Sequence, residues 1–489
     1  MDYVVGVDIG GTFTDCVALT PDRRIVHAKT PSTHATDPGE GVMAGVSELA
    51  EALGRPLSDF LGACGRVSHG TTIGTNLVVE RKGARTGLLT TAGHEDALSM
   101  MRGGGRTAGL PFEQVFSVQR TAKPEPLVPR ERIGAVFERV DRDGRVVAPL
   151  DEARARRTLG ELLSTHRIEA LAICLLWSFR NPAHERRLAE IARELAPDLF
   201  VSLSCEVSPQ LGEYERAVAT VINAYIGPAS ARYLRTTASR LSERGLAGPF
   251  LVMQANGGVI PVGAAERAPL ITLDSGPAGG LAGVAKLAGA AGHGNVIATD
   301  MGGTSFDVGL VVAGRPVIAE TCVLGQYTYR APHLDVRSIA CGGGSIAWVD
   351  PHTSSLRVGP HSAGSDPGPA AYGRGGREPT VTDADVVLGL VRADGFLDGR
   401  MPLDAAAARA AVARLGERLG LDVERTAAGI LQVNNAAAAN LIRQRTIQQG
   451  LDPRDFAIYA FGGAGPVHAF GFADELGVKT VVIPLGNGA

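Results

Sequence analysis

One acidic, glycine-containing pattern occurs twice in this 489-residue chain, and it constrains the fold more than any other feature. The first copy runs from Val5 to Asp15 and reads VGVDIGGTFTD. The second copy runs from Val296 to Asp307 and reads VIATDMGGTSFD. In each copy an apolar strand leads into an aspartate, a glycine pair, hydroxyl residues and a second aspartate. The repeat predicts two related strand–turn–strand hairpins within an α/β fold.

The residue types in these hairpins are those of a phosphate and metal site. Glycines let the backbone approach a ligand closely, and successive N–H groups in such turns bind anions. Asp8 and Asp300 would repel phosphate, so we expect a divalent cation such as Mg²⁺ between them and the phosphates. The residues expected to contact phosphate are Gly10, Gly11, Thr12, Thr14, Gly302, Gly303, Thr304 and Ser305. An ordinary hairpin with a glycine turn is the alternative for either copy alone.

The second aspartate of each copy has two interpretations. Asp15 and Asp307 could belong to the ligand site, or they could simply cap the turns of their hairpins. The sequence alone leaves both interpretations open.

Composition and charge exclude several classes of protein. The formal net charge is −3, which provides no basic surface for nucleic acid or a membrane. No apolar run approaches the length of a membrane span, and the chain begins with a predicted strand rather than a signal peptide. The six cysteines are scattered without a CxxC pair, which argues against a disulfide framework or a structural zinc site. We therefore expect a cytoplasmic globular protein.

The order of predicted elements indicates two α/β lobes. Helical spacing of apolar residues covers 38–54, 150–166, 182–196, 209–245, 405–419 and 423–449, and strands alternate with these helices. We assign residues 1–200 to one lobe and 201–489 to the other, so that each lobe carries one hairpin. Duplicated mixed sheets flanked by helices would then hold a nucleotide in the cleft between the lobes. Residues 340–376 are expected to be mostly loop.

A third glycine turn follows a predicted strand near the end of the chain. Gly462, Gly463 and Gly465 lie between that strand and a helix. We expect these glycines to contact the adenosine end of a nucleotide. Plain strand–helix packing is the alternative interpretation.

Several local strings make the chain similar to the hydantoinase A/oxoprolinase family, within the sugar kinase/Hsp70/actin ATPase superfamily. These strings are LGEYERA at 211–217, NAY at 223–225, MQANGG at 253–258, SGPA at 275–278, GSDPGPAAYG at 364–373 and GGAGPVH at 462–468. The resemblance implies an actin-like ATPase fold and ATP-dependent phosphorylation of a carbonyl oxygen. The substrate implied is a cyclic amide such as a hydantoin, 5-oxoproline or another lactam, whose ring opens with the help of a B-type partner subunit.

Three function classes remain open at this point. The first is the ATP-using subunit of a cyclic amide hydrolase, and the second is the ATP-using subunit of an acetone- or acetophenone-type carboxylase. The third is a non-catalytic assembly protein switched by nucleotide, as actin is. In all three cases we expect an oligomer.

A few further residues have a functional and a structural interpretation. His69 precedes a Gly-Thr-Thr turn and could contact substrate or phosphate, or could be a packed histidine. His468 is interpreted as structural. Gly342–Ser345 could be another ligand loop or a plain turn. Cys205 and Cys341 have no evident paired base, so a nucleophilic role is disfavoured for both.

Overall fold

A computed structural model describes residues 2–10, 13–31, 37–110, 112–119, 121–396, 399 and 401–486. The contacts within the chain divide it into two compact units. Unit 1 comprises Met1–Val67, Gly276–Ile318 and Leu334–Ala489, and unit 2 comprises Ser68–Ser275 and Ala319–His333.

This division by contacts differs from the division at residue 200 expected from sequence order. The chain leaves unit 1 after Val67, returns at Gly276, leaves again for a short hairpin, and returns at Leu334. Both acidic hairpins therefore lie in unit 1, although they are far apart in the sequence. Sequence order does not say when a chain returns to a core that it has already started.

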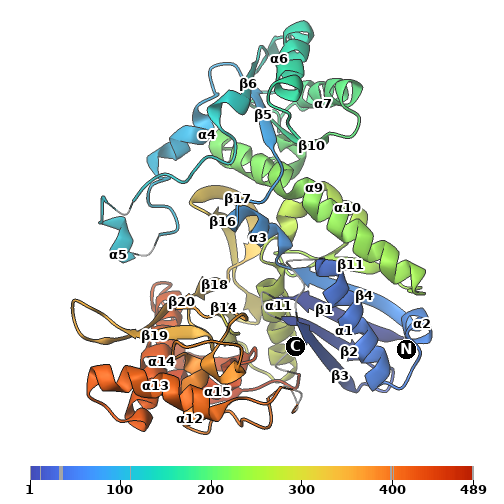
Figure 1. Ribbon diagram of the computed structural model, residues 1–489. Coiled ribbons are helices and arrows are strands. Elements are labelled where there is room, and N and C mark those ends of the chain that lie inside the picture. Colours follow the sequence, from blue (N-terminus) through green and yellow to red (C-terminus); the bar gives the residue numbers. More distant parts are fainter. Residues whose placement is uncertain are drawn as a thin grey trace. The chain divides into compact units, whose positions relative to one another are not determined.

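The first hairpin lies in unit 1 and is part of a six-stranded sheet. The strands β1 (Tyr3–Ile9), β2 (Phe13–Leu19) and β3 (Ile25–Pro31) pair in that order, and β4 (Cys64–Thr71) lies on the other side of β1. The helix α1 (Pro38–Ala52) covers these strands (Figure 1). A Cβ added at Gly45 of α1 would lie 2.3 Å from Cys16 Sγ, so this close approach of helix to strand requires glycine.

The second hairpin belongs to a second sheet of unit 1, which is buried on both faces. The sheet order is β15-β14-β13-β21-β22, and β18 also pairs with β14. The strands are β13 (Val296–Met301), β14 (Phe306–Val312), β15 (Arg315–Pro316), β18 (Arg337–Ile339), β21 (Ala457–Phe461) and β22 (Thr480–Val482). Val296 and Ala298 pack against α11 (Ser275–Ala290), whereas Ile297 packs with α14 (Val423–Ile447) and α15 (Gly465–Leu476). Burial of both faces explains the nearly continuous apolar sequence of the central strands β13, β14 and β21.

A small helical layer with its own hairpin completes unit 1. The strands β19 (Ser345–Val349) and β20 (Leu356–Ser362) pair within the stretch expected to be mostly loop. The helices α12 (Val381–Val387) and α13 (Ala405–Leu419) pack with α14 through a shared apolar cluster (Figure 1). This layer lies directly beside the second hairpin and supports it.

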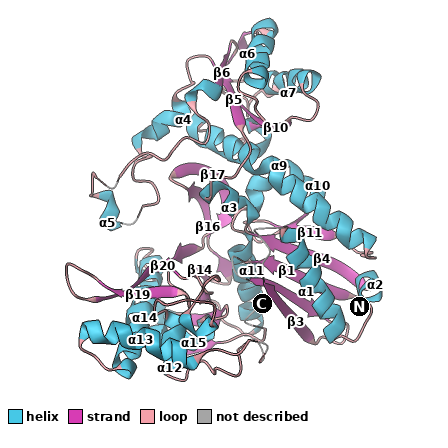
Figure 2. Cartoon of the chain, viewed as in Figure 1, coloured by secondary structure: helices cyan, strands magenta, loops and turns pink. Residues whose placement is uncertain are grey.

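Unit 2 is built around a parallel sheet and one long helix. The sheet order is β10 (Phe200–Leu203), β9 (Ala170–Cys174), β5 (Thr86–Thr91) and β6 (Ile133–Val136). Figure 2 shows α6 (Glu152–Ser164) and α7 (Ala183–Leu195) next to these strands. The helix α9 (Glu213–Glu243) is 31 residues long, and its residues from Tyr214 to Gly227 are all buried, the polar Glu215, Arg216, Thr220 and Asn223 included.

The remaining elements are short. The helices are α2 (Leu57–Gly62), α3 (Ile73–Val79), α4 (Ala97–Met100), α5 (Phe112–Val115), α8 (Ser204–Val207) and α10 (Val262–Arg267). The strands are β7 (Arg139–Val140), β8 (Val146–Ala148), β11 (Phe250–Met253), β12 (Val259–Pro261), β16 (Ile318–Leu324) and β17 (Tyr327–Leu334). Within the described ranges, every helix is too short or too polar to span a bilayer.

Candidate functional site

The two acidic hairpins share one strand register as well as one sequence pattern. In the first, Asp8 of β1 lies directly opposite Asp15 of β2. In the second, Asp300 of β13 lies directly opposite Asp307 of β14. Each hairpin therefore brings two carboxylates together across its strands, an arrangement that is destabilising unless other groups compensate it.

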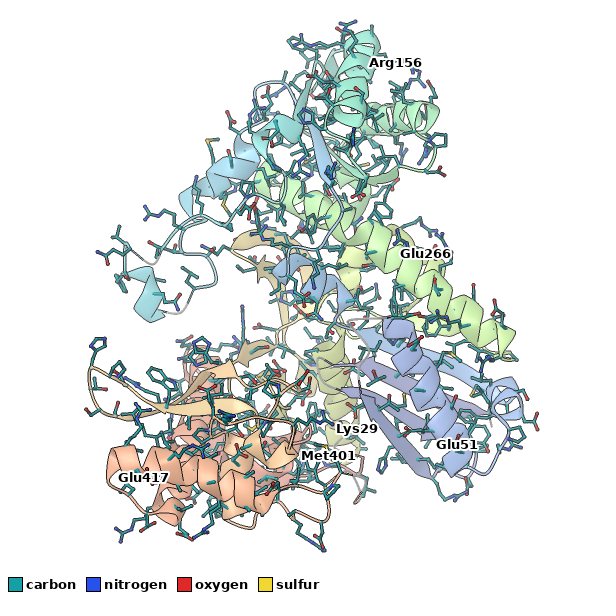
Figure 3. All side chains as sticks on the ribbon, in the orientation of Figure 1. Lys29, Glu51, Arg156, Glu266, Met401 and Glu417 are labelled. Carbon is teal, nitrogen blue, oxygen red and sulfur yellow. The ribbon has the colours of Figure 1, made fainter. Side chains whose placement is uncertain are left out.

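The outer aspartate of each pair is compensated by a third strand. Lys29 of β3, labelled in Figure 3, lies opposite Asp15, and its Nζ is 2.5 Å from Asp15 Oδ1. On the second hairpin Ser338 of β18 takes the equivalent place, and its hydroxyl donates to Asp307 Oδ1. The hydroxyl of Ser305 donates to Asp307 Oδ2 at 3.2 Å. Asp15 and Asp307 are thus occupied by neighbouring side chains, which leaves the inner aspartates for a ligand.

The inner aspartates lack such compensation. Burial and the nearby Asp15 raise the pKa of Asp8 to about 6, against a smaller opposing effect of Lys29. Burial, Asp307 and then Asp8 raise the pKa of Asp300 to about 7. Asp8 Oδ1 is a buried atom that has no hydrogen-bond partner among the described residues. Because each inner carboxylate is desolvated and Asp8 acts on Asp300, a cation placed at this pair would be strongly favoured.

A glycine faces each inner aspartate. Gly462 has φ +81°, and a Cβ added there would lie 2.2 Å from Asp300 Oδ1. A Cβ added at Gly276, at the start of α11, would lie 3.1 Å from Asp8 Oδ1. The absence of side chains at these two positions lets backbone approach the acids, which is the geometry required for a bound phosphate–metal group.

The turn of the second hairpin presents free amide groups. The N–H of Gly302 donates to the carbonyl of Ser305 at 3.1 Å and closes the turn. Gly303 and Thr304 are exposed, and within the described ranges their backbone N–H groups have no hydrogen-bond partner. Adjacent free N–H groups at a tight turn form an anion-binding nest.

The loop Gly342–Ser345 braces this turn from behind. The N–H of Gly343 donates to Gly302 O at 3.0 Å, and the N–H of Gly344 donates to Gly303 O at 2.6 Å. The N–H of Gly342 donates to Ser345 Oγ at 2.9 Å. These amides are occupied, so the loop acts as a support for the hairpin and not as a further ligand loop.

The donor set fits a magnesium ion that is bound mostly by phosphate. Among the described residues, no group of three or more His, Cys, Asp or Glu side chains is placed to hold a metal alone. Mg²⁺ in phosphoryl-transfer sites commonly takes one or two carboxylates, with water and phosphate oxygens as its other ligands. Asp8 and Asp300 would supply these carboxylate ligands, and Asp8 Oδ1 has no hydrogen-bond partner among the described residues.

Comparisons with protein-family models match two long regions of the chain. A hydantoinase/oxoprolinase model matches residues 216–489, and a model of the hydantoinase/oxoprolinase N-terminal region matches residues 4–196. The chain belongs to the hydantoinase/oxoprolinase family. These two matched regions follow the segments 1–200 and 201–489 of the sequence, whereas the compact units do not.

Individual relatives agree with this membership. The chain is 38% identical over 493 residues to the acetophenone carboxylase gamma subunit of Aromatoleum aromaticum, covering 98% of this chain and 66% of the relative. It is similar to the crystal structure of ATP-dependent caprolactamase from Pseudomonas jessenii, with TM-score 0.84 and 37% identity over 98% of this chain and 68% of that one. It is also similar to a nucleotide-free structure of acetone carboxylase, with TM-score 0.86 and 31% identity over 99% of this chain and 69% of that one. The predicted actin-like ATPase class of α/β fold is confirmed by these matches.

Not every residue predicted from the hairpin sequences to contact phosphate is described. Gly11 and Thr12 lie outside the described residues. Gly10 is partly exposed at the end of β1, whereas Thr14 is wholly buried. Gly463 is exposed in the third glycine turn, and Gly465 begins α15. The described part of the site therefore comprises the first hairpin without Gly11 and Thr12, the second hairpin and the glycine turn.

His69 lies in unit 2 and is packed. Its side chain is wholly buried, its Nε2 lies 2.8 Å from the hydroxyl of Tyr233, and its ring stacks on Phe250. These contacts support the structural interpretation of His69 over contact with substrate or phosphate.

The cysteines expected to be unreactive have no features of nucleophiles. Cys341 Sγ donates to Asn434 Oδ1 at 3.0 Å, and burial raises the pKa of its thiol to about 12. Burial and the adjacent Glu185 raise the pKa of Cys205 as well. Thiolates are disfavoured at both positions.

Four residues of this site escaped sequence reasoning. Lys29, Ser338 and Gly276 contact or face the aspartates, and Asp385 contacts His468 behind the glycine turn. Lys29 could have been found by extending the first hairpin to a third strand. Ser338 and Asp385 carry no local signal, because their roles depend on which elements pack together.

Proposed function

We propose that this chain is the ATP-using subunit of a cyclic amide hydrolase. The observation that carries the proposal is the pair of uncompensated carboxylates, Asp8 and Asp300, held in matched hairpins beside the free amides of Gly303 and Thr304. This set suits a triphosphate with its metal ion. The names of the relatives support the same nucleotide, since caprolactamase is described as ATP-dependent.

The chemistry proposed is activation of a poor electrophile. The carbonyl oxygen of a hydantoin, 5-oxoproline or other lactam forms a bond to the γ-phosphorus of ATP, and the bond from that phosphorus to the ADP oxygen breaks. The product is an O-phosphorylated imidate, whose phosphate is a good leaving group. Water then adds to the activated carbon, and the ring C–N bond of the resulting tetrahedral intermediate breaks as the nitrogen takes up a proton. The acyl phosphate that remains is hydrolysed by a second water, which releases the carboxylate and inorganic phosphate.

The residues of this chain would mainly position ATP and, through the metal ion, neutralise the charge of its phosphates. The amides of Gly303 and Thr304 would bind phosphate oxygens, and the glycine turn at residues 462–465 would lie against adenosine. Asp8 and Asp300 would hold Mg²⁺, which supplies charge neutralisation at the transferring phosphoryl group. Such positioning and electrostatic stabilisation are most of what phosphoryl transfer needs.

A partner chain is proposed for the ring-opening step. The acetophenone carboxylase relative is named as a gamma subunit, which supports a multi-subunit assembly. We propose that a hydantoinase B-type chain completes hydrolysis after this chain has activated the substrate.

A ketone carboxylase subunit is the second candidate function. It is favoured by the 38% identity to the acetophenone carboxylase gamma subunit, compared with 37% identity to caprolactamase. The same phosphoryl transfer would then act on a ketone enolate and on bicarbonate. Release of ADP with lactams or hydantoins, compared with ketone plus bicarbonate, separates the two candidates in the presence of the partner chain.

Binding of Mg-ATP tests the nucleotide site directly. We expect calorimetry to detect one Mg-ATP per chain in the wild type and none in Asp300→Asn under the same conditions. Glu51→Gln on the exposed face of α1 is the matched loss of one carboxylate and should bind normally (Figure 3). A wild-type chain that binds no nucleotide would end the proposal.

A further inference from the structure

A buried polar pair lies directly behind the glycine turn. The Nε2 atom of His468, in the first turn of α15, lies 3.4 Å from Oδ2 of Asp385 on α12, and both side chains are at most 4% exposed. The other ring nitrogen, Nδ1, lies 3.1 Å from Oδ1 of Asn435 on α14. Three helices that are distant in sequence therefore meet at one imidazole.

From this pair, α12 is connected to the phosphate-binding turn by hydrogen bonds. Thr382 at the start of α12 donates to Gly343 O through its backbone N–H at 2.7 Å and its hydroxyl at 2.8 Å. Gly343 and Gly344 donate in turn to the carbonyls of Gly302 and Gly303. A displacement of α12 would thus be transmitted to the amides that face phosphate.

On the other side, α15 is connected to the same hairpin through its N-terminal turn. The N–H of Ala464 donates to the carbonyl of Met301 at 2.8 Å. Gly462 faces the Asp300 carboxylate with no room for a side chain. The contacts close into a ring that runs from the hairpin through the loop 342–345, α12, α15 and the glycine turn back to the hairpin.

The His468–Asp385 contact is the link of this ring made by two ionisable side chains. Within the described residues, neither Oδ1 of Asp385 nor Nε2 of His468 makes a hydrogen bond, so the 3.4 Å approach of Nε2 to Oδ2 is a close polar contact between two buried groups. Removing one member of a buried pair leaves the other without a partner, which the surrounding elements relieve by moving. Buried polar pairs of this kind can fix the register of the elements that carry them.

We propose that His468 and Asp385 are positioning residues that hold the glycine turn in register with the second phosphate hairpin. The inference rests on the proposed function, because the ligand is ATP. The adenosine end and the triphosphate end of ATP are bound at two places whose separation the ring fixes. When this separation matches the length of ATP, both ends bind at once, and whole ATP binds more tightly than either fragment alone.

The pair should therefore matter for whole ATP and not for its fragments. In His468→Gln and in Asp385→Asn, we expect the Kd of Mg-ATP to rise about tenfold, a coupling in the range usual for groups of one network. The inhibition constants of adenosine and of Mg-tripolyphosphate, measured in competition with ATP, should stay within about twofold of wild type. The double variant should be no weaker than either single variant, because the two side chains act as one link.

His293→Gln is the matched control for a histidine in the same unit. His293 Nδ1 lies 2.9 Å from the hydroxyl of Tyr459, outside the ring of contacts. This variant should leave all three binding constants unchanged. Melting temperatures measured without ligand identify any variant that has lost its fold, and Asp385→Asn then carries the test in place of His468→Gln.

The outcomes separate this inference from the proposed function. A wild type that binds no ATP removes the proposed function itself. A wild type that binds ATP, with variants whose ATP affinity is unchanged, overturns only the positioning role. Equal weakening of ATP and both fragments also overturns it, because a merely structural pair would disturb each half of the site alike.

Discussion

At the scale of single residues, the site contains two carboxylates whose charged forms are disfavoured by their surroundings. Asp8 and Asp300 are desolvated, and the neighbouring acids Asp15 and Asp307 raise their pKa values further. Lys29 and Ser338 satisfy the outer acids and leave the inner ones without equivalent partners. Stored electrostatic repulsion of this kind is typical of sites that a charged ligand completes.

Replacing Asp300 with asparagine should stabilise the ligand-free protein while it removes function. The pKa of Asp300 is raised to about 7, and each unit of pKa shift corresponds to about 1.4 kcal/mol, so removal of this charge should raise the free energy of unfolding at pH 8 by on the order of 4 kcal/mol. Denaturant unfolding of wild type and Asp300→Asn at pH 8 measures the difference. A variant less stable than wild type would show that Asp300 is held by contacts that favour its charge.

The same pKa shifts predict how stability depends on pH. A folded-state pKa of about 6 for Asp8 and about 7 for Asp300 means that the folded state binds more protons than the unfolded state above about pH 4. The contribution of these two groups is therefore complete below about pH 4 and is lost as pH rises to about 7.

Thermal unfolding between pH 5 and pH 8 tests this direction against a matched variant. The ligand-free wild type should lose more stability over this interval than the double variant Asp8→Asn/Asp300→Asn. Mg-ATP should raise the melting temperature more at pH 8 than at pH 5, because only the ionised acids attract the cation. Equal pH slopes for wild type and variant would contradict the assignment.

At the scale of elements, hairpin, loop and helix are fitted to one another by positions without side chains. Gly462 with φ +81° lies against Asp300, and the backbone of Gly342 lies against that of Gly303. The predicted helices at 38–54, 209–245 and 405–419 are found with small changes of their ends. The hairpin β19–β20 was missed because glycine and proline on both sides of two short strands gave the stretch the composition of a loop.

Alanine at Gly462 should damage the site through geometry alone. Its Cβ would lie 2.2 Å from Asp300 Oδ1 in a backbone conformation that alanine disfavours, so the turn must shift. We expect the Kd of Mg-ATP to rise at least tenfold, with a loss of roughly 1–3 kcal/mol in stability. Gly289→Ala in α11, where an added Cβ meets nothing within 4 Å, is the control and should be neutral or slightly stabilising. Calorimetry and thermal unfolding of both variants provide the measurements.

At the scale of the whole molecule, the elements of the proposed nucleotide site come from three segments of sequence gathered into unit 1. Both hairpins and the glycine turn belong to that unit, whereas His69 and the long helix α9 belong to unit 2. A site contained in one compact unit does not need another chain to assemble it. Nucleotide binding should therefore require only this chain, whereas substrate turnover should also require the partner chain.

This separation predicts a difference between binding and catalysis. The Kd of Mg-ATP for the isolated chain should lie within about threefold of its Kd for the assembled complex, a difference of less than about 1 kcal/mol in binding free energy. Ring opening of the cyclic amide should require the proposed B-type partner. The disappearance of the substrate measures this reaction. Calorimetry on the chain with and without partner, together with product analysis, tests both statements. An isolated chain that binds ATP only after addition of the partner would show that the site is incomplete without it.

The sequence by itself determined the family of the chain, the class of its fold and much of its secondary structure. A repeated Asp-Gly-Gly pattern has few physical uses, and the period of apolar residues reports which face of a helix or strand is buried. The tertiary structure alone decided that both hairpins lie in unit 1, that Lys29 and Ser338 satisfy the outer acids, that His69 is packed, and that His468 meets Asp385. These facts depend on contacts between segments far apart in the chain, and no local pattern of residues encodes which distant segment will be the neighbour.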